Sequence, residues 1–129
     1  MGFKRTILMD PFPKERPRFK GGRAHMSARY IEKKNLCRAL VGGFRVKKDT
    51  PLSMTLICYR AVPRSWTEAK RKEMSGTWTT AGGDADNLAG GVMDALFDDD
   101  SNIVFLLVER RWSDRKDRQG YMLLKIEEL

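Results

Sequence analysis

The stretch DADNLAGGVMDALFDDDSNIVFLLV, residues 84–108, combines a helical pattern, a cluster of acids and a strand pattern. Its apolar residues recur at helical spacing, at Leu88, Val92, Ala95 and Leu96. This spacing predicts a helix over about 88–96, with Asp86 or Asn87 as its cap. Residues 103–108 form a continuous apolar run, which predicts a central β-strand.

The segments on either side predict further strands and helices. Runs rich in β-forming residues predict strands at 6–9, 52–59 and 121–126. Helices are predicted over 28–41, capped by Ser27, and over 68–74, capped by Thr67. The segment 13–26, with its proline, glycine and basic residues, is expected to be a loop. A chain of 129 residues with this order of elements predicts one α+β domain over residues 1–129.

Composition excludes several classes of protein. No run approaches the roughly 18 apolar residues of a membrane helix, and the first residues lack the apolar core of a signal peptide. We therefore expect a cytoplasmic protein with no membrane partner. Cys37 and Cys58 lie far apart within apolar runs, and we expect two buried thiols rather than a disulfide. A single histidine and the lack of a Cys-x-x-Cys motif argue against structural zinc.

Charge is distributed unevenly along the chain. Residues 1–72 hold 19 Lys and Arg against 5 Asp and Glu, a balance of +14, whereas residues 73–129 hold 6 against 12, a balance of −6. A basic half indicates a polyanion partner such as nucleic acid, although a solvated basic face gives the same count.

Two basic clusters are candidates for contact with nucleic acid. The first surrounds Phe19 in the predicted loop and consists of Arg16, Arg18, Lys20 and Arg23. These cations can bind phosphates while Phe19 stacks or wedges between bases; the alternative is a solvated loop with Phe19 in the core. The second cluster, Lys70, Arg71 and Lys72, contacts either a nucleic-acid backbone or water.

Carboxylates are concentrated in residues 84–100, where no Lys or Arg occurs. In an extended loop, Asp84 and Asp86 point the same way. The loop that holds residues 98–100 is expected to be able to fold back beside them. Converging carboxylates repel one another unless a cation holds them, and Mg²⁺ is the natural candidate. Together with a basic surface for phosphate, this predicts a metal-dependent nuclease. For Asp94 and Asp98 we favour the alternative role of a cap or solvated acid.

Three motifs in this region resemble those of the RusA-like Holliday junction resolvases. They are Asp84-Ala85-Asp86-Asn87-Leu88, then Met93-Asp94-Ala95-Leu96, then Asp99-Asp100-Ser101-Asn102-Ile103-Val104. In that family the corresponding motifs are D-x-D-N-L, a helix ending in D-A-L, and a D-D pair before a hydrophobic strand. Gly22-Arg23-Ala24-His25-Met26-Ser27 also fits the early part of the family pattern, and Arg64-Ser65-Trp66 resembles its phage-type branch.

The resemblance implies a fold, an activity and a set of site residues. The fold is α+β, with a mixed sheet and helices packed on it. The implied activity is cleavage of four-way DNA junctions by a homodimer in recombination and repair, in a bacterial or phage setting. Mg²⁺, or Mn²⁺ in its place, would be held by Asp84, Asp86 and Asp100, with Asp99 as a further ligand, and no small-molecule cofactor is expected.

One residue departs from the family pattern. The family carries a lysine four residues after the second aspartate of D-x-D-N-L, and this chain has Gly90 there. A lysine would neutralise charge on the scissile phosphate or position the attacking water. One alternative is therefore a junction-binding protein with weakened or lost catalysis. The other is that Lys20, Arg18 or Arg110 reaches the site from elsewhere. RNA as the target is a third possibility, without an aromatic RNA-binding motif to support it.

Overall fold

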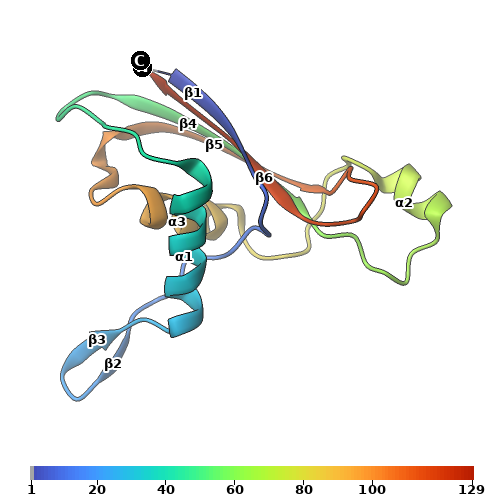
Figure 1. Ribbon diagram of the computed structural model, residues 1–129, viewed down its shortest axis with the longest axis horizontal. Coiled ribbons are helices and arrows are strands. Elements are labelled where there is room, and N and C mark those ends of the chain that lie inside the picture. Colours follow the sequence, from blue (N-terminus) through green and yellow to red (C-terminus); the bar gives the residue numbers. More distant parts are fainter. Residues whose placement is uncertain (1) are drawn as a thin grey trace.

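Burial alternates along the longest inner strand and identifies the face of the sheet that carries the core. The computed structural model describes residues 2–129 (Figure 1). In β4 (Leu52–Arg60), Leu52, Met54, Leu56 and Cys58 are buried, and the residues between them are half-buried. Period-2 burial of this kind marks a strand with one face against the core. Helices α1 (Ala28–Val41) and α3 (Ala85–Leu96) lie against that face (Figure 1).

The sheet is mixed, as the α+β fold class predicted. Its strands follow the order β1-β6-β4-β5, with only the β4–β5 pair parallel. The bounds of the outer strands and of the last strand are β1 (Gly2–Ile7), β5 (Ile103–Trp112) and β6 (Tyr121–Glu128). The smaller elements are β2 (Arg18–Lys20), β3 (Arg23–His25), α2 (Glu68–Met74) and the 3₁₀ turn η1 (Asp100–Asn102). No helix among residues 2–129 is long and apolar enough to cross a membrane.

Helix caps explain why two predicted helices have the predicted bounds. The Ser27 hydroxyl accepts a hydrogen bond from the Tyr30 amide at 3.1 Å, and α1 spans 28–41. The Thr67 hydroxyl accepts one from the Lys70 amide at 3.2 Å, and α2 spans 68–74. Each cap satisfies an amide that the first helical turn leaves without a partner. Both cysteines are buried free thiols, as expected.

The prediction that residues 103–108 form a central strand is wrong, because β5 lies at the edge of the sheet. The side chains of Val104, Phe105, Leu106 and Leu107 are 62%, 56%, 40% and 40% exposed. A continuous apolar run is typical of a strand covered on both faces, whereas here only Ile103 and Val108 pack against the core and the four residues between them stay exposed. The central positions belong to β6 and β4.

Only the second half of the outer edge of β5 is paired. The Thr79 amide donates to the Arg110 carbonyl and the Trp112 amide donates to the Thr77 carbonyl, at 3.2 and 2.9 Å. Trp78 bridges to Arg111 in antiparallel fashion. Within residues 2–129, no segment pairs with the outer edge of residues 103–109. We call residues 103–109 the open edge of β5.

Two adjacent glycines let the chain cross α3 closely. The segment 11–14 runs over the helix, where a Cβ on Gly91 would lie 2.5 Å from the Phe12 carbonyl oxygen. At Gly90, a Cβ would lie 3.2 Å from the Cβ of Lys14. The glycines that weaken the helical pattern by about 1 kcal/mol each therefore make room for this crossing.

Gly91→Ala is expected to destabilise the protein by about 1–3 kcal/mol despite its better helix propensity. The new methyl group would force the buried Phe12 and its carbonyl away from α3. Urea unfolding measures the loss. Gly90→Ala is the matched control, since its methyl group meets only the stem of an exposed lysine. Equal stability of wild type and Gly91→Ala would contradict the close crossing.

Candidate metal and nucleic-acid site

Asp84 and Asp86 lie at the start of α3 with exposed side chains. The helix begins at Ala85, so Asp84 is its N-cap residue and Asp86 lies in the first turn. The predicted cap at Asp86 or Asn87 and the predicted extended loop are therefore wrong. Asp84 makes no capping hydrogen bond with its side chain. Both carboxylates are stabilised by the positive end of the helix dipole. Because the Asp84 carboxylate does not cap the helix, it is available to another partner.

Asp99 and Asp100 lie beyond the other end of α3. The Asp99 carboxylate accepts a hydrogen bond from the Ser101 amide at 2.9 Å, and bonds with Ser101 lower its pKa. Asp100 begins η1 and is exposed. The side chain of Asn102 donates to the Thr50 carbonyl at 2.9 Å. This bond fastens the turn to the loop before β4, beside the N-terminal ends of β4 and β5.

The two acidic groups do not meet within one chain. Helix α3 has 12 residues and an axis of about 18 Å. Ile103, next to η1, pairs with Leu52 at the start of β4. Arg110 pairs with Cys58 near the end of β4, and its guanidinium contacts the carbonyl just before Asp84. The two acidic groups therefore lie toward opposite ends of these strands. The loop does not fold back as expected. Across residues 2–129, no three acidic, histidine or cysteine side chains are arranged to hold a metal ion.

Asp94 has a structural role, but not the predicted one of a cap or a solvated acid. Its carboxylate accepts a hydrogen bond from the Tyr30 hydroxyl at 2.8 Å and lies 3.3 Å from the Lys34 ammonium. Partial burial would raise the pKa of Asp94, but these hydrogen bonds outweigh it and lower the pKa. Asp94 thus joins α3 to α1 and is not available as a metal ligand.

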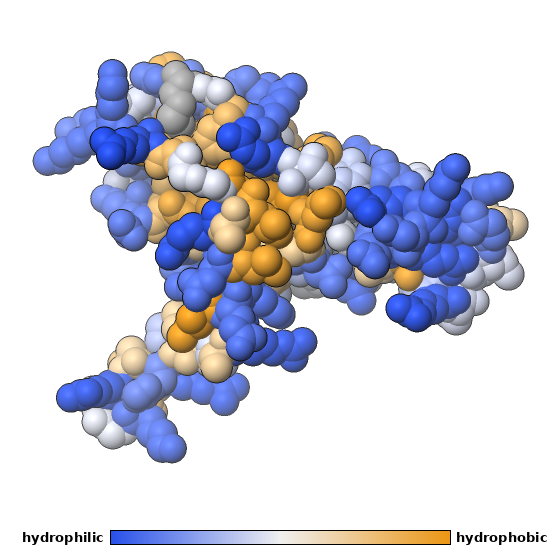
Figure 2. Space-filling model, viewed as in Figure 1, coloured by the Kyte–Doolittle hydropathy of each residue, from blue (hydrophilic) through white to orange (hydrophobic). Residues whose placement is uncertain are grey.

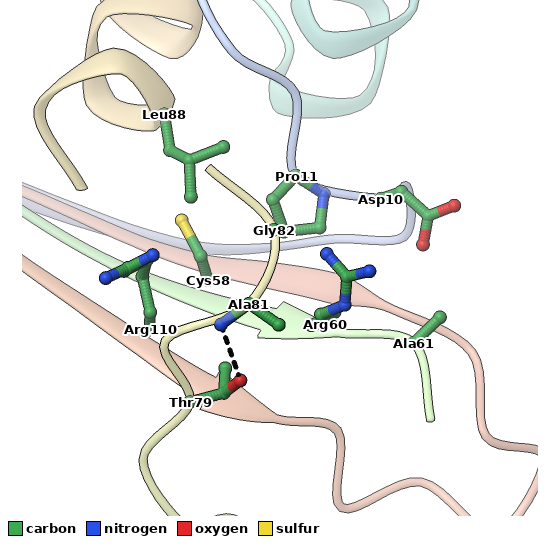
Figure 3. A pocket seen from close by; sticks show the side chains of 10 residues that line it. All are labelled: Asp10, Pro11, Cys58, Arg60, Ala61, Thr79, Ala81, Gly82, Leu88 and Arg110. Carbon is green, nitrogen blue, oxygen red and sulfur yellow. Dashed lines mark hydrogen bonds between the residues drawn. The ribbon is translucent and has the colours of Figure 1, made fainter. Parts of the chain in front are cut away.

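A cavity of about 270 Å³ opens beside the start of α3 (Figure 3). Arg60 and Arg110 flank it, Leu88 and Cys58 form an apolar part of its wall, and Asp10 lies at its margin. Burial raises the pKa of the Cys58 thiol to about 12, so the thiol stays protonated and inert at neutral pH. The cavity thus places two guanidinium groups near the segment that leads to Asp84.

The residues before Asp84 hold these arginines in place. The guanidinium of Arg110 donates to the carbonyls of Gly83 and Thr80, the latter at 3.2 Å. Arg60 lies directly against Gly82, whose φ of +96° favours glycine and where a side chain would collide with the guanidinium. Arg110 is among the cations expected near the site from the sequence, whereas Arg60 is not. The pair Gly82-Gly83 just before the acidic motif was the available signal.

Lys14 lies where a side chain at residue 90 would begin. Its amide donates to the Asn87 carbonyl at 2.8 Å, which fastens it to the first turn of α3. Its Cβ and Cδ lie 3.2 and 3.3 Å from the position of a Cβ on Gly90. Lys14 is not among the replacement cations expected from the sequence, because nothing in the sequence indicates that segment 11–14 crosses α3.

The two basic clusters differ in their environments. The segment 13–26 is not wholly a loop, because β2 and β3 form a hairpin that carries Arg18, Lys20 and Arg23 with exposed side chains. In the second cluster, Arg71 is only 4% exposed and donates two hydrogen bonds to the Glu68 carboxylate, at 2.6 and 2.9 Å. Burial and the pair with Glu68 leave Arg71 little exposed surface for a nucleic-acid contact. Lys72 stays exposed, and Lys70 lies over the Trp66 ring at 4.6 Å.

Comparison with known proteins gives one informative result. Residues 9–119 match a family model described as Endodeoxyribonuclease RusA. The matched part is 111 of the 129 residues and includes the hairpin, both acidic groups and the cavity. A search of curated proteins found no match.

Proposed function

Because the chain belongs to the RusA endodeoxyribonuclease family, which implies Holliday junction resolvase activity, we propose that it is a Mg²⁺-dependent nuclease that cuts branched DNA as a homodimer. Mn²⁺ can substitute for Mg²⁺ in this proposal, and the setting is DNA recombination and repair in a bacterium or phage. The observation that supports it is the pair of exposed carboxylates at the start of α3, with the Arg110 guanidinium on the Gly83 carbonyl just before them and the Lys14 amide bonded to the Asn87 carbonyl just after them. Carboxylates can bind a divalent cation, and neighbouring cationic side chains can bind a phosphodiester. Together they suit hydrolysis of a nucleic-acid backbone.

One chain alone does not bring the proposed metal ligands together. Asp84 and Asp86 supply carboxylates at one end of α3, and Asp99 and Asp100 supply carboxylates near the other. Mg²⁺ is commonly bound by one or two carboxylates, but three acids from both motifs cannot converge within a protomer. The proposed ligand set therefore needs a second copy.

The open edge of β5 supports a specific arrangement of two copies. An edge strand with unpaired main-chain groups and four exposed apolar side chains is a ready template for another strand. We propose that the open edges of two copies pair antiparallel about a two-fold axis. Such a contact is self-complementary, as in most homodimers. It would cover the apolar residues that overturned the central-strand prediction.

This pairing would also bring the two acidic groups together. In an antiparallel pair, the N-terminal end of one β5 lies beside the later half of the other. Asp100 begins η1, the turn that immediately precedes β5, and the later half of β5 carries Arg110, which contacts the residue before Asp84. Each dimer would then have two composite sites, each with Asp84 and Asp86 from one copy and the partner subunit's Asp100.

In each composite site the chain's residues would have distinct roles. Asp84, Asp86 and the partner subunit's Asp100 would hold the divalent ion, which when bound lowers the pKa of water and withdraws charge from a phosphate. Arg110 and Arg60 would bind the phosphodiester strand that enters the cavity. Two sites related by a two-fold axis suit a four-way junction, whose opposing strands share that symmetry.

The alternative of a weakened or inactive junction-binding protein rests on Gly90. The position of Lys14 favours the active enzyme, because its stem fills the space of the missing side chain. Gly90 is then the residue that lets Lys14 lie there. We propose that Lys14 supplies the cation that the family pattern places at residue 90.

The purified protein tests the proposal against the alternative directly. It is incubated with a synthetic four-way junction and Mg²⁺, Mn²⁺ or EDTA, and the strands are resolved on a denaturing gel. Paired incisions that need the divalent ion support the proposal. Tight junction binding with no incision at any metal concentration would instead support the inactive alternative.

A further inference from the structure

The hairpin is a regular two-stranded ribbon. Arg18 pairs with His25, Phe19 with Ala24 and Lys20 with Arg23. The connecting residues Gly21 and Gly22 both have positive φ, +60° and +76°. Two such residues make the type I′ turn that matches the twist of antiparallel strands. We call residues 15–27 the arm.

The register gives the arm two unlike faces. Side chains opposite one another, and those two apart on a strand, share a face. One face therefore carries Arg18, Lys20, Arg23 and His25. The other face carries Phe19, which is 80% exposed, and Ala24. An irregular basic loop would not place its cations and its aromatic ring on separate faces in this way.

The arm is held firmly at its base and stands clear of the body (Figure 1). The Glu15 carboxylate accepts hydrogen bonds from the amide and hydroxyl of Ser27, at 3.1 and 2.8 Å. Just before it, the Lys14 amide is bonded to Asn87, the residue after Asp86. The arm thus projects from beside the candidate acids. In Figure 2 it forms a separate lobe that ends in hydrophilic side chains.

The charges on the arm favour an external anion. Residues 16–26 contain no Asp or Glu, and Glu15 is occupied by Ser27. Lys20 stands directly opposite Arg23, and like charges at opposed positions destabilise a strand pair. A two-stranded hairpin is marginal by itself. A polyanion along the basic face would relieve this repulsion.

We propose that the arm is a branch-sensing DNA ribbon: its basic face binds backbone phosphates and Phe19 stacks on bases exposed at the branch point. The substrate class rests on the proposed function. A two-stranded ribbon fits a DNA groove, and the phosphate contacts work on any duplex. The Phe19 ring needs the face of an unstacked base, which a branch point offers and a continuous duplex hides. Affinity and selectivity for branches thus come from opposite faces of the arm.

Binding in EDTA, where a divalent-dependent enzyme cannot cut, separates the two faces. The probes are a fluorescent four-way junction and a linear duplex of the same arm sequence. Phe19→Ala is expected to bind the junction about tenfold more weakly and the duplex as wild type does. Phe19→Trp should retain selectivity, and we expect its fluorescence to change on junction binding more than the wild-type signal does. The double variant Arg18→Gln/Lys20→Gln should bind both probes more weakly. The salt dependence of its affinity should fall by the equivalent of about two phosphate contacts.

Controls and outcomes keep this inference separate from the proposed function. Lys116→Gln, an exposed cation in the turn before β6, should leave both affinities unchanged. An unchanged ratio of junction to duplex affinity in Phe19→Ala would overturn the arm's role, even if the wild type cuts junctions well. Conversely, a selective arm in a protein that never cuts would refute only the nuclease proposal.

Discussion

Heterodimers of Asp86→Asn and Asp100→Asn subunits are expected to nick a four-way junction that neither variant cuts alone. Each homodimer carries the same substitution in both sites. Losing a carboxylate ligand should slow cleavage at least about a hundredfold, because removing even a residue that only hydrogen-bonds to a metal ligand lowers activity about 10–100-fold. If each site combines Asp84 and Asp86 of one copy with the partner subunit's Asp100, the heterodimer has one doubly damaged site and one intact site. It should then cut one strand at about half the wild-type rate.

Two differently tagged subunits, co-expressed and purified through both tags, supply the heterodimer. Nicked and fully resolved junctions are separated on a native gel, and nicking alone is expected. A heterodimer as inactive as its parents would mean that each site belongs to a single chain. Asp98→Asn, an exposed acid in the same loop, is the matched control and should keep full activity. Leu106→Glu, on the open edge of β5, should prevent both dimerisation and complementation.

Lys14→Ala is expected to slow junction cleavage by roughly a hundredfold, the usual cost of one charge-stabilising donor, without weakening junction binding. Gly90→Lys alone should not raise the rate, because its Cβ would press on the stem of Lys14 at 3.2 Å. The double variant Lys14→Ala/Gly90→Lys should recover much of the lost activity, because the new lysine takes the vacated space. Single-turnover rates and junction affinities for the three variants measure these effects.

Lys14→Arg separates charge from packing, since it keeps the cation and should retain more activity than Lys14→Ala. Lys116→Ala, an exposed cation in the turn before β6, is the matched control. Two results would count against Lys14: full activity in Lys14→Ala, or a large gain in Gly90→Lys with Lys14 present. The second would revive the interpretation of a crippled enzyme.

Local patterns predicted the helices well and the sheet less well. The bounds of α1 and α2 follow from Ser27 and Thr67, whose caps act within one turn. In contrast, β5 was predicted to be central but lies at the edge of the sheet. An apolar run indicates that a strand is covered, but not whether the same chain or another one covers it. The hairpin was missed although Gly21-Gly22 is a two-residue turn signal, since its strands have only three residues each.

For the site, the sequence by itself determined which chemical groups are present: acids in two motifs, a basic first half, an aromatic residue among cations, and the family. Tertiary structure alone decided that the two acidic motifs lie apart and that Arg71 is occupied by Glu68. It also decided that Arg60 lies near the start of α3 and that Lys14 lies against Gly90. The reason is physical. Side-chain chemistry and capping depend on neighbours in sequence, whereas the crossing of α3 and the open edge of β5 depend on contacts between residues far apart in the chain.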